Sequence, residues 1–129
     1  MRRAKVSKLE QRFALIWRSL DGPALEREFR FHPTRKWRAD FAHLPSRTLI
    51  EIEGGIWIRG RHTSPRGFIA DAEKYLEATL GGWRVLRLVD QQIKAPTIQR
   101  IVAMCLQLPN SISSQNRPLR CDRSEHDPP

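Results

Sequence analysis

Three acidic residues lie within apolar, strand-like sequence in residues 38–55, RADFAHLPSRTLIEIEGG. Asp40 is followed eleven positions later by Glu51, and Glu53 comes two positions further on. A carboxylate in a half-buried strand is costly unless something pairs with it. Converging carboxylates repel one another by roughly 3 kcal/mol per pair at about 6 Å and an effective dielectric of about 20. A divalent cation removes this repulsion, so the pattern predicts a metal site formed by these three acids.

The two glutamates belong to a segment that alternates apolar and polar side chains. Successive side chains of a strand point to opposite faces. Ile50 and Ile52 should therefore face the core, while Glu51 and Glu53 are presented together on the other face.

The acid of the preceding strand, Asp40, is expected to share a face with Arg38 and Ala42. By the same alternation, Ala39 and Phe41 point to the opposite face. A hairpin between the two strands would place Asp40 beside Glu51, with both sets of apolar residues on the core side.

The hydrophobic periods along the chain predict an α/β fold. We expect one domain over residues 1–108 and a disordered, polar tail over residues 109–129. Its core is expected to be a central mixed sheet of about four strands flanked by helices, with a crossover helix leading to the last strand. The expected helices cover residues 7–20, 68–80 and 97–108, and the expected strands cover residues 28–32, 37–42, 48–53 and 83–89.

The charge balance of the chain favours a polyanionic partner. Lys and Arg number 23 against 14 Asp and Glu, a net charge of +9. Such an excess raises encounter rates with polyanions, and arginine suits bidentate contact with phosphate. We therefore expect the chain to bind DNA through basic residues in a loop and a turn. These residues are Arg35, Lys36, Arg59, Arg61 and Arg66.

The two cysteines, Cys105 and Cys121, are far apart and lie outside any CxxC motif, so neither a zinc site nor a disulfide framework is indicated. Cys105 falls in an apolar helical pattern and is expected in the core. No apolar run is long enough to span a membrane, and no signal segment is apparent. The sequence thus predicts a cytoplasmic protein without a membrane partner.

Several segments resemble the PD-(D/E)XK nuclease superfamily. The spacing of Asp40 from the EIE motif is that of its signature, and EIEGG, GRH and DAEKYLEATLGGWRVLRL are similar to the branch related to very-short-patch mismatch-repair endonucleases. EFRFHPTRKWRADFA and GRHTSPRGFIADAEKY resemble small phage and prophage endonucleases of that branch. The resemblance covers roughly residues 8–93.

The resemblance implies a restriction-endonuclease-like core and Mg²⁺- or Mn²⁺-dependent hydrolysis of DNA phosphodiester bonds, in the host cytoplasm if the chain is phage-encoded. It implies that Asp40 and Glu51 hold the metal. Position 53 is commonly Lys in this family and is Glu here, and Lys74 is our candidate for the missing cation. His62 resembles a histidine that assists chemistry at the phosphate.

Glu10 resembles an additional acid near the metal, and Glu28 and Glu26 are alternatives to it. Mg²⁺ prefers oxygen ligands and needs only a few carboxylates besides substrate phosphate. For Asp40 and Glu51 the alternative to a metal role is a surface ion pair with Arg38 or Arg47.

Three other functions remain open. Because Lys is missing at position 53, the chain could be a catalytically inactive, nuclease-fold accessory protein that binds DNA. A regulatory DNA-binding protein would leave the acids unexplained, and no helix-turn-helix pattern stands out. An RNA-directed nuclease is a third alternative. The DNA structure that is cut, and the choice between monomer and homodimer, are left undetermined.

Overall fold

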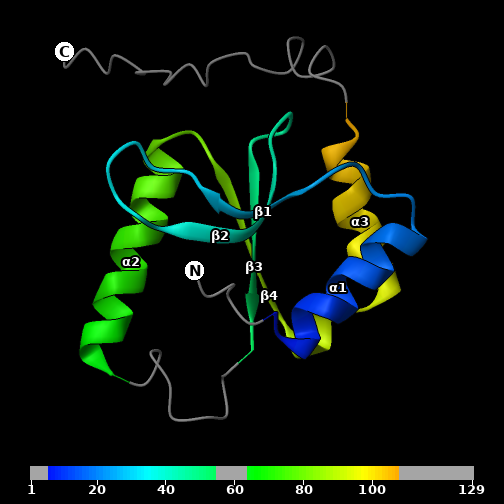
Figure 1. The fold of residues 1–129 in the computed structure, drawn as a ribbon, viewed down its shortest axis with the longest axis horizontal. Coiled ribbons are helices and arrows are strands. Elements are labelled where there is room, and N and C mark those ends of the chain that lie inside the picture. The colour runs from blue at the N-terminus through cyan, green and yellow to red at the C-terminus, as the bar shows by residue number, and fades with distance from the viewer. Residues whose placement is uncertain (1–5, 55–63, 108–129) are drawn as a thin grey trace, which may run out of the picture.

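The computed structural model describes residues 6–54 and 64–107 (Figure 1). Its elements, in chain order, are α1 (Lys8–Ser19), β1 (Glu26–Arg30), β2 (Arg38–His43), β3 (Thr48–Glu53), α2 (Pro65–Leu80), β4 (Arg84–Val89), the 3₁₀ helix η2 (Asp90–Gln92) and α3 (Ala95–Cys105). None of the helices in the described residues is long and apolar enough to cross a membrane. The expected tail, residues 109–129, lies outside the described residues.

The four strands form one mixed sheet in the order β1-β2-β3-β4. β1, β2 and β3 pair antiparallel as a meander, and β4 pairs parallel with β3. A parallel pair needs a crossover connection, and α2 lies between β3 and β4 in the chain. The predicted order of elements and the α/β class with a four-stranded mixed sheet are confirmed.

Several element boundaries differ from the predicted ones. β1 covers Glu26–Arg30, two residues earlier than the predicted strand at residues 28–32. α2 begins at Pro65 and α3 at Ala95, both earlier than predicted. The prediction was wrong here because it assigned prolines to the preceding loops. Proline fits the first turn of a helix, where the N–H that it lacks has no intrahelical partner.

Helices cover both faces of the sheet, with α1 and α3 on one side and α2 on the other (Figure 1). On the first side, Phe13 and Trp17 of α1 join Ile50 of β3 and Ile98 of α3 in one buried cluster. On the α2 side a smaller cluster forms around Leu49, the neighbour of Ile50 on β3. The expected core position of Cys105 is confirmed, since only 5% of it is exposed.

The alternation predicted for β2 is wrong at Asp40. Ala39 and Phe41 were expected on one face, but they pack into different clusters. Phe41 lies with α1 and α3, whereas Ala39 lies with Ala78 of α2.

The break coincides with an unusual backbone conformation in the partner strand. Glu28 has φ of 49°, in the left-handed region that non-glycine residues rarely adopt. The paired residues on either side of it, Arg27 with Phe41 and Phe29 with Ala39, place it opposite Asp40. The hairpin therefore turns at this pair, and its tip bends over α2 (Figure 1).

Two side-chain contacts hold the bent hairpin against α2. Arg35 Nη1 lies 3.1 Å from Glu73 Oε1, and His32 Nε2 lies 3.3 Å from Glu77 Oε2. His32 Nδ1 accepts the backbone N–H of Arg35 at 2.9 Å. The ring proton must therefore lie on Nε2, which donates to Glu77.

The turn after α1 allows a direct test of packing. A Cβ on Gly22 would lie 2.3 Å from Trp17 Nε1, an atom whose N–H donates to the Pro23 carbonyl at 2.8 Å. Because that bond and burial fix the indole, Gly22→Ala should lower the free energy of unfolding by about 1–3 kcal/mol in urea titrations. Gly54→Ala is the control, since its Cβ would meet only the flexible end of Leu9, at 3.3 Å. Equal stability of the two variants would contradict the packing assigned to Trp17.

Candidate metal centre

Three carboxylates from three elements meet beside the bend of the hairpin. One oxygen each from Glu10 of α1, Glu28 of β1 and Asp40 of β2 lie within 4.8 Å of one another. Glu10 and Asp40 are half-buried, and Glu28 is exposed. Ionised carboxylates at this distance repel by roughly 3 kcal/mol per pair at an effective dielectric of about 20. A divalent cation would relieve that repulsion.

The start of α1 fixes the position of Glu10. Ser7 is the N-cap residue, and its hydroxyl accepts the Glu10 N–H at 3.1 Å. The Glu10 carboxylate accepts the Ser7 N–H in return, also at 3.1 Å. This capping box satisfies two backbone donors that a helix end leaves open. It uses Glu10 Oε2, so Oε1 is the oxygen outside the capping box.

Asp40 joins β2 to β3 through its side chain. Its Oδ2 accepts the backbone N–H of Ile52 at 2.7 Å. Burial raises the pKa of Asp40 from 3.8 to about 6, although the Ile52 N–H opposes the shift, and the nearby Glu10 and Glu28 raise it further. The carboxylate is therefore held in place, and its ionised form is destabilised while no cation is close. A bound cation would stabilise the ionised form, as expected for a metal ligand.

Glu51 lies on the α2 face of the sheet, where Lys74 binds it. Lys74 Nζ lies 2.6 Å from Glu51 Oε1 and donates to the Arg38 carbonyl at 2.9 Å. Only 9% of Glu51 is exposed, and burial raises its pKa from 4.5 to about 7 despite the opposing effect of Lys74. Asp40 and Glu53 raise that pKa too, so the three acids share one electrostatic environment.

Glu53 points to the same face as Glu51, as the alternation predicted. Its Oε1 accepts Arg87 Nε at 2.8 Å and the Tyr75 hydroxyl at 3.2 Å. The Arg87 guanidinium also lies 4.4 Å from the centre of the Tyr75 ring. Burial, together with the charges of Glu51 and Glu53, raises the pKa of Tyr75 above its ordinary value, so its hydroxyl keeps its proton and donates.

The structure brings together only part of the predicted set. Within residues 6–54 and 64–107, the group of acidic, histidine or cysteine side chains that meets the 4.8 Å limit is Glu10, Glu28 and Asp40. Glu51 and Glu53 lie outside that group and form ion pairs with Lys74 and Arg87. Lys74, proposed from the sequence as a cation near the metal, does lie at Glu51.

Other predicted residues lie elsewhere. His62, Arg59 and Arg61 are outside the described residues. Arg66 and Lys36 are exposed, in the first turn of α2 and at the hairpin tip.

The neighbouring Arg35 is paired with Glu73 and stacks 4.2 Å from the Trp37 ring centre, so it is the most restrained of the predicted phosphate contacts in the described residues. Glu26, an alternative to Glu10, is exposed at the start of β1 and is not part of the acidic group.

Arg87 is a residue that the sequence interpretation missed. The parallel register of β3 and β4 makes Arg87 the partner of Glu51, two positions before Glu53. The signal was an arginine within the otherwise largely apolar strand sequence WRVLRLV, residues 83–89. Only the pairing of the two strands shows that this arginine faces the acids.

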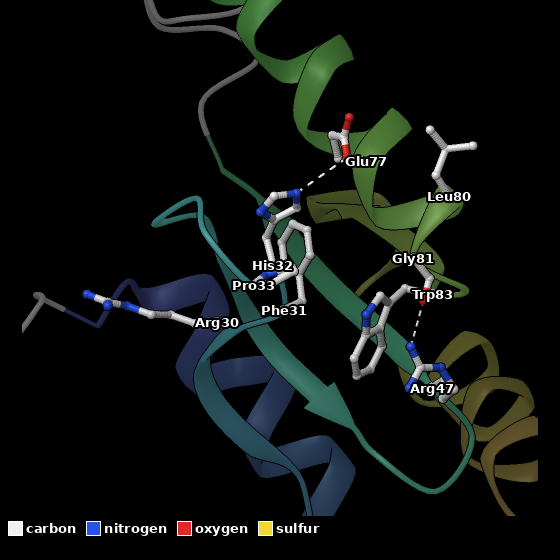
Figure 2. A pocket seen from close by; sticks show the side chains of 9 residues that line it. All are labelled: Arg30, Phe31, His32, Pro33, Arg47, Glu77, Leu80, Gly81 and Trp83. Carbon is white, nitrogen blue, oxygen red and sulfur yellow. Dashed lines mark hydrogen bonds and ion pairs between the residues drawn. The ribbon is translucent and has the colours of Figure 1, made fainter.

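A separate groove of about 630 Å³ lies between the hairpin and the C-terminal end of α2 (Figure 2). Trp83 lies between Phe31 and Arg47 there, with the Arg47 guanidinium 4.3 Å from a Trp83 ring centre. Among the described residues that line it, Glu77 is the only carboxylate, and it is bonded to His32. The described lining of the groove thus offers a single carboxylate, whereas three carboxylates meet at the bend of the hairpin.

No protein-family model matches the chain, and neither a curated protein nor a solved structure matches it.

The raised pKa of Asp40 predicts a pH-dependent stability. Between about 3.8 and about 6 the folded protein keeps a proton that the unfolded chain has lost. The stability from this group is full below the lower value and is lost as the pH rises through the upper one. Asp40→Asn keeps an acceptor for Ile52 and never ionises. In the presence of a chelator, it should gain about 2 kcal/mol over the unsubstituted protein between about pH 4 and about pH 8.

Urea titrations at both pH values measure this gain. Glu26→Gln, at an exposed position on β1, controls for the loss of one negative charge. A difference between Asp40→Asn and the unsubstituted protein that stays constant with pH would show that Asp40 is not destabilised by ionisation.

Proposed function

We propose that the chain is a metal-dependent endonuclease that hydrolyses DNA phosphodiester bonds. The observation that carries the proposal is the meeting of Asp40 with Glu10 and Glu28 beside the Glu51–Lys74 pair. Oxygen-rich acidic clusters bind Mg²⁺ or Mn²⁺. The net charge of +9 makes this acidic cluster exceptional within the chain and supports a polyanionic substrate.

We further propose that the sheet and its helices are a restriction-endonuclease-like core of the PD-(D/E)XK type. The support is the order of elements, with the signature acids on two adjacent antiparallel strands and a crossover helix leading to a parallel fourth strand. The sequence resemblance, over roughly residues 8–93, covers all of these strands.

In this proposal Asp40, Glu10 and Glu28 hold the cation, and Glu51 lies beside them. The raised pKa of Asp40, caused first by burial and then by the neighbouring acids, fits such a role because cation binding stabilises the ionised form. A bound divalent cation supplies Lewis acidity and lowers the pKa of a coordinated water.

The chain's own groups would position the reactants. Lys74 fixes Glu51 from the α2 side and supplies a positive charge where phosphate charge would build up. Arg87 stands next to Glu51 in register and neutralises Glu53. These two cations are our candidates for the role that Lys commonly plays at position 53. Exposed Lys36 and Arg66 would contact DNA phosphates away from the cut bond.

A catalytically inactive, nuclease-fold protein that binds DNA is the second candidate. The ion pairs favour this candidate. In the described residues, both predicted metal ligands on β3 are already paired with a basic side chain, Glu51 with Lys74 and Glu53 with Arg87. Calorimetric titration with Mn²⁺ separates the candidates. Binding that is lost in Asp40→Asn supports the nuclease, whereas the absence of binding in the unsubstituted protein supports the second candidate.

The cleavage experiment uses the full chain with Mg²⁺ or Mn²⁺ and a panel of duplex, mismatched, branched and single-stranded DNA. At least one substrate should be cut. Asp40→Asn should abolish cutting while DNA binding is kept, because the substitution removes a ligand and no phosphate contact. Glu26→Gln is the matched control and should cut normally. If no DNA in the panel is cut with either cation, the proposed activity is wrong.

Lys74→Met tests the cation on α2. The substitution should lower kcat by about 10²-fold or more, because it removes a charge aimed at the reacting phosphate. Lys94→Met, at an exposed position before α3, should cut at the unsubstituted rate. An unchanged kcat in Lys74→Met would mean that Lys74 only fixes Glu51. A loss of kcat of about 10²-fold in Arg87→Met would then assign the stabilisation of the phosphate to Arg87 of β4.

A further inference from the structure

The side of α2 that faces away from the sheet is apolar. Four large hydrophobic residues on this helix are mostly exposed: Phe68 (67%), Ile69 (65%), Leu76 (58%) and Leu80 (71%). The opposite side of the helix is also buried against the sheet, through Gly67 and Ala78. A helix that is hydrophobic on both sides is normally covered on both sides.

No charged residue interrupts this outer face. Residues 68, 72, 76 and 80 recur every fourth position, which aligns them along one side of a helix. Thr79 is its one polar member, and its hydroxyl donates to the Tyr75 carbonyl at 3.0 Å, so it needs no other partner. The face is therefore a continuous apolar strip on the exposed side of α2, and the side chain of Leu80 points away from the sheet (Figure 2).

We propose that a second copy of this chain covers the outer face of α2, so that the two α2 helices pack antiparallel about a two-fold axis at Ala72. Ala72 is the small residue of the strip, with Phe68 four positions before it and Leu76 four positions after it. The axis places Phe68 of each copy against Leu76 of the other, while the two alanines let the helices approach closely.

Charge restricts the surfaces through which two copies can meet. Two chains of net charge +9 repel one another wherever basic surfaces meet, so self-association requires an uncharged face. Arg66 and Glu77 lie on one edge of this face, eleven positions apart and almost equally far from Ala72. In the antiparallel pair each Arg66 falls near the Glu77 of the other copy, whose Oε2 contacts His32 of its own chain and whose second oxygen, Oε1, is the one we assign to Arg66. Residues 108–129 are predominantly polar and do not match the strip.

The size of the face suits a dimer of moderate affinity. Sixteen residues of helix extend about 24 Å. A strip of this length, with four large apolar side chains from each copy, falls toward the smaller end of specific interfaces. A closed two-fold pair buries both strips and leaves neither exposed for further growth.

Sedimentation equilibrium of the full chain, from low to high micromolar concentration, tests the proposal. The unsubstituted protein should approach twice the chain mass of 15.0 kDa. Leu76→Glu should sediment at the single-chain mass throughout, because it buries a charge in the strip. Leu15→Glu is the matched control, since Leu15 is 64% exposed on α1, away from this face, and its dimer should persist. Far-ultraviolet circular dichroism checks that both variants are folded.

A charge swap tests the antiparallel arrangement. Arg66→Glu should weaken the dimer at least tenfold, and adding Glu77→Arg should restore it, which a partner other than a second copy would not produce. Glu77→Arg alone also removes the contact with His32, so its circular dichroism and dimer affinity are measured beside those of the double variant. A single-chain mass for the unsubstituted protein at every concentration overturns the proposal and leaves the strip to a different occupant. A dimer that persists in Leu76→Glu overturns it as well, because the copies would then meet through another surface.

Discussion

The hydrogen bond from the Ile52 N–H to the Asp40 carboxylate connects the β1–β2 hairpin to β3. At 2.7 Å it joins β2 to β3 at the place where the β1–β2 hairpin turns toward α2. Glu28, with its positive φ, lies opposite Asp40 at the same turn. One carboxylate thus stabilises the bent sheet and also supplies a candidate metal ligand, and the fold and the site depend on the same group.

The acids of the site are handled in two different ways. Glu51 and Glu53 are neutralised by cations from α2 and β4, which offset the cost of placing them next to the core. Asp40, in contrast, lies near two further acids, Glu10 and Glu28, whose charges repel its own and raise its pKa. Functional sites commonly hold such perturbed acids. This contrast is why we place the proposed cation at Asp40 rather than between Glu51 and Glu53.

The helix α2 serves the proposed site and the proposed dimer with opposite faces. Its inner side carries Lys74 and Tyr75, which hold the acids of β3. Its outer side carries the strip around Ala72. If both proposals hold, each dimer contains two acidic sites linked through paired helices, and a change in the packing of α2 would be felt at Glu51. Two sites in one assembly would allow both strands of a duplex to be cut by the same dimer.

The sequence by itself determined the class of fold, the order of the elements and the shared face of Glu51 and Glu53, because these follow from local periodicity. It also indicated Asp40, Glu10 and Lys74, through residue type and through resemblance to a family. It did not predict the turn at Glu28, because a positive φ on glutamate has no local signal. Tertiary structure alone decided that Glu10 and Glu28 meet Asp40, and that Arg87 faces Glu51. Those contacts depend on the register between strands and on the packing of α1, which involve residues far apart in the chain.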